Sequence, residues 1–500
     1  MPEAIAKRSS MPETGTASNA EYVLCILQNR DSISRILSVD GARKQGSMSD
    51  THKGLAVSEK IGYSMGDMAA NFFFQALLAL QLSFYTDTFG LTPAQAGTMF
   101  LVVGLVAAAL NPVMGFIADR THHRWGRFRP WLLWTSLPFG VIGVLTFTTP
   151  QISPGAKVLY AWTTYLLLRV VYVVNNVPYA ALTGVITDDP NERTSVTSYR
   201  QISANLAGFI VQSLAIPLVI LLGGGNSARG YQYTMGLFSA ISVVLFVIAF
   251  AVTKERIQPN PEQKSSVLQD LGDLMHNGPW VALFLVTLFY FAGISIRGSV
   301  MLPYFKYCAG NELMFSWFNG FGLAALLIGV MFSPALVKRL GKRTVFLVSL
   351  FFTAFFCMTL WWIPAHSSTS VILSEVLRQL SYGVSCPVLW AMMADVADYG
   401  EWKTGRRATA TVTAAVVFAL WVGLALGGAV TGWLFSSYGY LPNAVQSALA
   451  LEGIRLTASF YAGVAFLCAM ACLFFYGISM KLNLTISQEL TERRKGYTAQ

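Results

Sequence analysis

Charged residues are scarce in this sequence of 500 residues. Asp, Glu, Lys and Arg make up 12% of the chain, whereas hydrophobic residues make up 54%. A soluble globular domain carries roughly 25% charged residues, so this chain lacks the charge that normally covers a water-exposed surface. The composition therefore excludes an ordinary soluble protein and indicates a chain that lies largely within a membrane.

Other features are also missing. The six cysteines show no paired spacing, which argues against a disulfide framework or a cysteine metal site. No Gly-rich loop with a following Lys suggests nucleotide-driven pumping, and no acid–base or metal cluster suggests an enzyme. We therefore expect a non-enzyme without a cofactor. Residues 1–58 lack an apolar run long enough for a signal peptide, and we expect them to form a disordered cytoplasmic extension.

Long apolar runs dominate the rest of the chain. They show no alternation of polar and apolar residues, which excludes an outer-membrane barrel. Each is long enough for a membrane-spanning helix of about 20 residues. The sequence thus predicts an all-α polytopic membrane protein with twelve transmembrane helices, at about 63–86, 95–118, 131–149, 156–182, 202–223, 231–252, 280–303, 313–337, 344–364, 368–393, 409–435 and 456–480.

The basic residues lie in alternate loops between these runs. One set of loops carries Arg120, Arg124, Arg127, Arg129, Lys254, Arg256, Lys264, Lys338, Arg339, Lys342, Arg343, Lys403, Arg406 and Arg407. Because basic loops stay inside, both termini are predicted to be cytoplasmic, in the inner membrane of a bacterial-type cell. The net charge of +10 is explained by this orientation, so the expected partner is the lipid bilayer and not nucleic acid. No obligate protein partner is evident.

The spans fall into two sets of six. The polar stretch 253–279 separates them as a cytoplasmic linker, and 481–500 forms a polar cytoplasmic tail. The basic loop after span 2 has a counterpart after span 8, at 338–343. Matching loops in the halves 59–252 and 280–480 suggest a parallel repeat, as in the major facilitator fold, in which the solute site lies at the midplane between the halves.

Several segments have a familiar pattern. They are Lys60 to Asp67, Phe84 to Asp87, Asn111 to Gly115, Trp125 to Pro130, Asn176 to Leu182, Asn191 to Arg193 and Ala394 to Gly405. Through these segments and their order, the chain resembles the glycoside–pentoside–hexuronide:cation symporters, the family of melibiose permease, within the major facilitator superfamily. The resemblance implies alternating-access transport of a glycoside, pentoside, hexuronide or sulfosugar. It also implies coupling to a cation through carboxylates on spans 1, 2 and 4.

The carboxylates of that coupling site are replaced in this sequence. The corresponding positions are Asn71, Ala107, Asn111 and Asn176, and a family Lys on span 11 corresponds to Trp421. An amide neither takes up a proton at ordinary pH nor neutralises a cation. The sequence therefore favours facilitated diffusion or coupling through another group, with Na⁺ and H⁺ both open. A membrane sensor or receptor that binds solute without transporting it is the alternative.

Candidate substrate-binding residues come from the resemblance and from polar groups inside the spans. An intramembrane arginine is a functional candidate by default, and aromatic rings stack on sugars. The candidates are Asn71, Tyr172, Asn176, Arg200, Arg297, Trp390 and Trp421. Rival structural roles stay open. Asn111 precedes Pro112 and can satisfy a kinked backbone, Arg297 can pair with a carboxylate such as Asp67, and Glu375 can pair with Arg378.

Charged residues at the predicted cytoplasmic ends are candidates for a gate between the halves. They lie in the loop after span 2 and beyond the end of span 10 at about 393: Asp119, Arg120, Arg127, Asp395, Asp398 and Glu401. In facilitator proteins the loops at this end hold the halves together when the inner side is closed. We expect a gating role for these residues and no direct contact with substrate.

Overall fold

The computed structural model describes residues 55–187, 190–256, 277–404 and 409–498. The chain divides into two units, Met1–Ala56 and Val57–Gln500. Of the first unit only Leu55 and Ala56 are described. The predicted disorder of 1–58 and most of the predicted linker 253–279 therefore lie outside the described residues.

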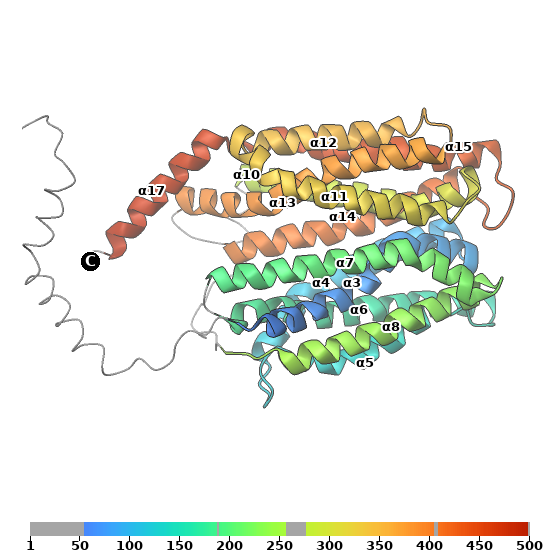
Figure 1. Cartoon of the computed structure of the whole chain (residues 1–500), viewed down its shortest axis with the longest axis horizontal. Coiled ribbons are helices and arrows are strands. Elements are labelled where there is room, and N and C mark those ends of the chain that lie inside the picture. The colour runs from blue at the N-terminus through green and yellow to red at the C-terminus, as the bar shows by residue number, and fades with distance from the viewer. Residues whose placement is uncertain (1–54, 188–189, 257–276, 405–408, 499–500) are drawn as a thin grey trace, which may run out of the picture. The chain divides into compact units, whose positions relative to one another are not determined.

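The second unit is built from helices. The first set, here the N-half, comprises α3 (Val57–Ser83), the π-helical turn η1 (Phe84–Thr88), α4 (Pro93–Arg120), α5 (Arg129–Thr146), α6 (Pro154–Ile186), α7 (Pro190–Gly223) and α8 (Ser227–Val252). The second set, the C-half, comprises α10 (Gly278–Pro303), the π-helical turn η2 (Tyr304–Cys308), α11 (Met314–Leu340), α12 (Lys342–Thr359), α13 (Ser368–Thr404), α14 (Thr409–Ser437), α15 (Ala448–Leu456), η3 (Thr457–Tyr461), α16 (Ala462–Leu473) and η4 (Phe474–Tyr476). Figure 1 shows the two sets as adjacent groups, blue to green and yellow to red.

Within the described residues, eleven helices are long and apolar enough to cross a membrane. They match eleven of the twelve predicted spans. The twelfth, predicted at 131–149, corresponds to α5, whose 18 residues are less apolar because they include Arg129, Thr135 and Ser136. Since α5 packs against α6 and α8, it completes the N-half as its sixth long helix.

Some helices extend beyond the apolar runs. The carboxylates Asp395, Asp398 and Glu401 were expected in a loop, but α13 continues to Thr404 and carries them on its last turns. The polar tail predicted at 481–500 contains a helix, α17 (Met480–Thr498). This helix packs against α13, and the indole of Trp402 donates to Glu489 at 2.7 Å. Hydropathy alone missed both extensions because neither segment is apolar.

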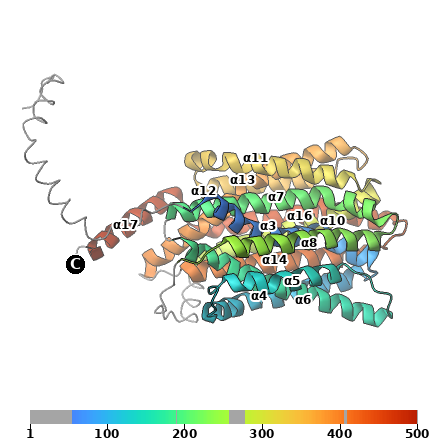
Figure 2. The same cartoon turned by 60° about the horizontal axis from the view of Figure 1, so that its bottom comes forward.

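The two ends of the bundle differ in charge. We call one the basic end, which carries the loop 121–128 and the α11–α12 junction at Gly341, and the other the far end, which carries the loops 89–92, 147–153 and 438–447. The halves approach closely where α4 meets α14 toward the far end. A Cβ atom at Gly97 would lie 2.8 Å from the carbonyl oxygen of Ala429, so the helices need a residue without a side chain there. Contacts of α3 with α10 and of α7 with α11 complete this interface (Figure 2).

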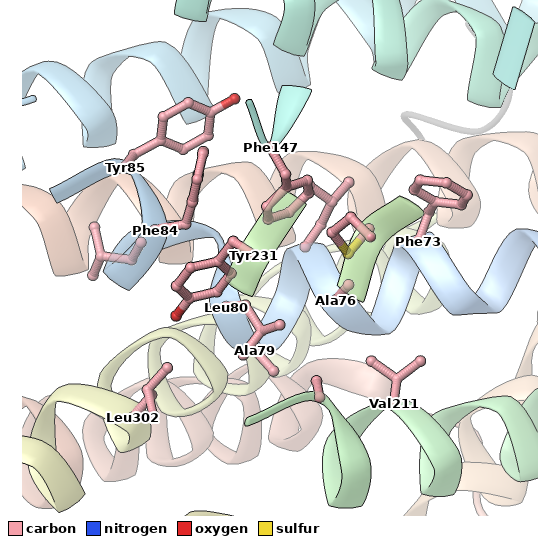
Figure 3. Close-up of a cluster of buried hydrophobic side chains, with 14 of the residues drawn as sticks. Phe73, Ala76, Ala79, Leu80, Phe84, Tyr85, Phe147, Val211, Tyr231 and Leu302 are labelled. Carbon is pink, nitrogen blue, oxygen red and sulfur yellow. The ribbon is translucent and has the colours of Figure 1, made fainter. Parts of the chain in front are cut away.

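Hydrophobic packing joins the halves at the far end. One buried cluster contains residues of both halves, and Figure 3 shows Ala79 and Leu80 of α3 in the same cluster as Leu302 of α10. A second cluster contains only C-half residues, from Trp280 to Ile478, and lies toward the basic end. The shared apolar cluster thus packs the halves against each other toward the far end, while the C-half packs by itself toward the basic end.

Candidate functional site

One face of α6 carries a row of polar and aromatic side chains, which we call the α6 stripe. Its members are three or four residues apart, so they lie above one another along the helix. They run from the middle of α6 toward the basic end: Arg169, Tyr172, Asn176, Tyr179 and Thr183. Such a row inside a membrane protein must find polar partners in the protein or in a ligand.

Trp421 of α14 contacts the end of the stripe that lies in the middle of the bundle, at Arg169 and Tyr172. Its ring lies 5.7 Å from that of Tyr172 and 6.0 Å from that of Phe74 on α3, centroid to centroid. The Arg169 guanidinium carbon lies 4.6 Å from the centre of the Trp421 ring. The structure therefore brings together Tyr172 and Trp421, two of the predicted substrate residues, at a point where the N-half meets the C-half.

Arg200 of α7 occupies the other end of the stripe. Its Nε lies 3.6 Å from Oδ2 of Asp67, and its Nη1 donates to the Thr183 hydroxyl at 3.2 Å. The guanidinium also lies 5.0 Å from the Tyr179 ring. Tyr63 and Tyr179 stack at 4.7 Å, and each donates its hydroxyl to the other's carbonyl oxygen at 2.8 Å. This tyrosine pair fixes α3 to α6 and holds the surface against which Arg200 lies.

The asparagines divide into two kinds. Asn175 is buried and donates to Thr135 of α5 at 2.6 Å, which is a helix–helix contact. Asn176, one residue later, is only partly buried and has no hydrogen bond to another described residue. Asn71, also partly buried, donates to the Asp67 carbonyl at 2.9 Å and lies one turn from that carboxylate. Asn176 within the stripe and Asn71 beside it thus keep free amide capacity.

The former family cation positions on α4 show a structural role. Asn111 donates to the Ala107 carbonyl at 2.8 Å, just before Pro112, whose ring cannot donate a backbone hydrogen bond. The Asn111 amide is thus engaged by its own helix, and the carbonyl that Pro112 leaves without a backbone donor, that of Ala108, lies 3.5 Å from the amide nitrogen. Ala107 is buried and offers no polar atom.

Arg297 does not join the stripe. It is 3% exposed and donates to Glu375 of α13 at 3.0 Å and to the Ala458 carbonyl. Arg378 also bonds Glu375, with its Nε at 2.9 Å, so one carboxylate serves two arginines. The structural alternative for Arg297 named the wrong acid, since Asp67 pairs with Arg200. Arg297 belongs to a buried ion cluster inside the C-half.

Two other groups of predicted residues lie away from the stripe. Trp390 of α13 is 41% exposed, and no ring contact joins it to Trp421 among the described residues. Three of the gate candidates, Asp119, Arg127 and Asp395, form ion pairs within their own half. Arg127 pairs with Asp119 at 3.1 Å, and Lys342 pairs with Asp395 at 2.7 Å. Asp398 and Glu401 have partners of their own.

A far-end network, which we define by Asp87, Lys306, Tyr307, Tyr440 and Asn443, does bridge the halves. The Asp87 carboxylate accepts from Lys306 at 2.6 Å, from Tyr307 at 2.8 Å and from Tyr440 at 2.5 Å. Asn443 donates to the Asp87 carbonyl and accepts from Lys306 at 2.9 Å. Burial and the neighbouring Asp87 carboxylate raise the pKa of Tyr440, so its hydroxyl remains a donor.

Sequence reasoning missed this network. Asp87 and Lys306 lie on η1 and η2, the π-helical turns that end α3 and α10 at equivalent places in the two halves. Such turns often occur at functional sites. The signal available in the sequence was a carboxylate, Asp87, directly after an apolar run with a lysine at the matching place of the second half.

Residues 62–480 match the family described as MFS/sugar transport protein. The chain belongs to this family. The resemblance to glycoside–pentoside–hexuronide:cation symporters is thereby confirmed, and with it the expectation of a multi-pass membrane transporter and not an enzyme.

Relatives align over nearly the whole length. The chain is 34% identical over 449 residues to the inner membrane symporter YicJ of Escherichia coli (strain K12), covering 88% of this chain and 96% of that protein. It is 37% identical over 423 residues to the isoprimeverose transporter of Lactiplantibacillus pentosus, covering 84% of this chain and 88% of that protein.

The solved structures support the fold. A bacterial homologue of the human lysosomal transporter Spinster, in an inward-facing and unoccupied conformation, aligns with a TM-score of 0.62 at 14% identity. The alignment covers 87% of this chain and 99% of that one. At this identity the likeness concerns the fold alone, which is the major facilitator fold predicted from the sequence.

Proposed function

We propose that this family member transports a sugar or sugar derivative by alternating access around the α6 stripe. The observation that carries the proposal is the contact of Tyr172 with Trp421. It places two aromatic rings, one from each half, beside Arg169 in the middle of the bundle. A sugar ring offers an apolar face for such rings and hydroxyls for the partly buried amides of Asn71 and Asn176. A ligand bound there contacts both halves, so its binding depends on their relative position.

The closed far end supports an assignment of state and orientation. Because basic loops stay in the cytoplasm, we assign the basic end to the cytoplasm, both termini included, and the far end to the outside of the inner membrane. The relative YicJ is named an inner membrane symporter. With the Asp87 network and the shared apolar cluster sealing the far end, this state presents the stripe toward the cytoplasm. We assign residues 59–252 and 280–480 to the two moving halves.

We propose that coupling, where it exists, does not use the family cation site. The four positions hold three amides and one methyl group, and the Asn111 amide already donates to a carbonyl of its own helix. Hard cations prefer charged oxygen ligands, which these positions lack. Among the described residues, the carboxylate that borders the stripe is Asp67, which pairs with Arg200 at 3.6 Å. Asp67 is therefore the group through which a Na⁺ or H⁺ gradient would act.

The substrate belongs to the range of the family: a glycoside, pentoside, hexuronide or sulfosugar. One relative is named an isoprimeverose transporter and another a putative sulfoquinovose importer, so both neutral and acidic sugars occur among the relatives. The proposal is tested by measuring uptake of such a panel into liposomes that contain the purified protein, with and without imposed Na⁺ and H⁺ gradients. Uptake that equilibrates without a gradient indicates a facilitator. Accumulation that an Asp67→Asn variant loses assigns coupling to Asp67.

Two matched variants test the site itself. Trp421→Ala should abolish uptake of the best substrate, because it removes the C-half wall of the stripe. Trp362→Ala removes a tryptophan that is 68% exposed and lies near the far end, and it should leave uptake unchanged. Binding of a sugar without any uptake would instead identify a sensor or receptor.

A further inference from the structure

Arg169 is a buried arginine without an acidic partner. Three arginines in the described helices are buried, and two of them, Arg297 and Arg378, share Glu375. Arg169 is 8% exposed and has no hydrogen bond or ion pair to any described residue. Its Nε atom is fully buried without an acceptor. A guanidinium always carries its charge, so this site holds an uncompensated positive charge in the middle of the membrane.

The neighbours of Arg169 do not supply what it lacks. The rings of Trp421 and Tyr172 lie 4.6 Å and 5.9 Å from its guanidinium carbon, and their faces attract a cation. A ring face, however, does not replace the planar pair of oxygen acceptors that matches the guanidinium fork. The acid nearest along the stripe, Asp67, is engaged by Arg200. The remaining acceptor must come from outside the described chain.

A cavity lies beside the guanidinium. Its volume is 40 Å³, about that of one water molecule or one carboxylate group. Arg169, Gln81 and Tyr165 line it from the N-half, and Ser295 and Leu424 line it from the C-half. The Gln81 oxygen accepts from the Tyr165 hydroxyl at 3.2 Å, which directs the amide nitrogen elsewhere as a further donor. The cavity therefore offers donors from Arg169 and Gln81 to a small group that carries negative oxygens.

We propose that Arg169 binds the anionic group of an acidic sugar, a carboxylate or a sulfonate, in this cavity. The proposal rests on the proposed function, namely that the stripe binds a sugar. Trp421 and Tyr172 contact the pyranose ring, and the oxyanion accepts a bidentate pair of hydrogen bonds from the guanidinium. The cavity walls come from both halves, so the anion would lie between them, although the Ser295 hydroxyl itself donates to the Leu424 carbonyl at 2.7 Å. Arg169 is then the residue that separates acidic from neutral substrates.

The test uses matched probes that differ only at C6. Methyl β-glucuronide carries a carboxylate, methyl β-glucoside carries a hydroxymethyl group, and the corresponding 6-deoxy-6-sulfo glucoside carries a sulfonate. Their affinities for the purified protein are measured by calorimetry and by the shift in melting temperature. We expect the wild type to bind at least one acidic probe about tenfold to a hundredfold more tightly than the neutral probe, which is the range of a charge-assisted bidentate contact.

Variants assign this preference to a residue. Arg169→Gln should lose the preference while retaining the neutral probe, and Arg169→Lys, which keeps charge but not the fork, should retain part of it. Arg455→Gln is the control. Arg455 also lies over a tryptophan, 5.0 Å from the Trp361 ring, but at the far end of the C-half, and its loss should leave the preference intact. The ligand-free Arg169→Gln protein should melt at a higher temperature than the wild type, because an unpaired buried charge has been removed.

The outcomes separate the two proposals. Equal affinity of the wild type for acidic and neutral probes, or a preference that survives in Arg169→Gln, overturns the role of Arg169 and leaves sugar transport standing. Binding of none of the sugars in the wider panel overturns the proposed function and this inference with it. A lower melting temperature in Arg169→Gln without ligand contradicts the unpaired charge and indicates a structural arginine. The two acidic probes distinguish a carboxylate from a sulfonate as the preferred group.

Discussion

Replacing Asp87 by Asn removes the charge at the centre of the far-end network. The Asp87 side chain is 4% exposed and accepts hydrogen bonds from one lysine and two tyrosines. Removing one partner of a buried ion pair costs about 3–5 kcal/mol. We take the lower value, about 3 kcal/mol, because the Lys306 side chain is 26% exposed and Asn keeps one oxygen acceptor. The network joins the halves only when the far end is closed, so this loss shifts the equilibrium toward the open far end by about a hundredfold.

Labelling of a buried cysteine measures that shift. In a background without native cysteines, Ser295→Cys places a thiol in the wall of the cavity beside Arg169, at a position that is 2% exposed. A membrane-impermeant maleimide added to right-side-out vesicles reaches this thiol only when the far end opens. The labelling rate should rise by about a hundredfold in Asp87→Asn, or to the limit set by full opening.

A second charge removal serves as the control. Asp119→Asn breaks a pair with Arg127 that lies within the N-half at the basic end, and the Asp119 side chain is 62% exposed. The labelling rate should not change in this variant, since no contact between the halves is lost. Equal labelling rates in the parent and in Asp87→Asn would refute the view that the network holds the far end closed.

Other expectations concern stability, coupling and pH. Glu375→Gln leaves two arginines without their acid and should destabilise the protein by about 3–5 kcal/mol, seen as a lower melting temperature, whereas the exposed Glu452→Gln should have little effect. Asn176→Asp restores a carboxylate at a family coupling position and should make uptake more dependent on a Na⁺ or H⁺ gradient; unchanged dependence would show that this position no longer faces the ion path. Because the pKa of Tyr440 is raised, its protonated form stabilises the fold up to and beyond its ordinary value of about 10. The stabilising contribution of this hydroxyl is lost only above that value, so the difference in melting temperature between wild type and Tyr440→Phe should be constant from about pH 6 to about pH 9.

The helices were predictable because a membrane leaves the chain few choices. Apolar runs of about 20 residues must form helices to satisfy their backbone groups, and this rule located the spans. The rule gives no information about segments that are polar. The end of α13 beyond 393 and helix α17 are polar, so nothing in their hydropathy distinguished them from loops. The third span fell short of the usual hydropathy because α5 carries several polar residues.

The candidate site was predictable in part. Residues on one helix face share a neighbourhood, so the sequence placed Tyr172 and Asn176 together, and the resemblance added Trp421 from the other half. It could not tell which of two adjacent asparagines faces a neighbouring helix, because that depends on a rotation of about 100° set by packing. Nor could it tell which buried arginine lacks an acid. The sequence pointed to Arg297, but Glu375 compensates that arginine, whereas Arg169 has no acid among the described residues.

Counterflow in proteoliposomes tests the central claim most directly. Vesicles preloaded with an unlabelled sugar of the family range are diluted into labelled sugar, with no ion gradient present. We expect transient accumulation of label with the wild type and with Trp362→Ala, and none with Trp421→Ala, because exchange requires the site between the halves to alternate. Sugar binding without counterflow in the wild type would contradict transport and leave a receptor built on the same fold.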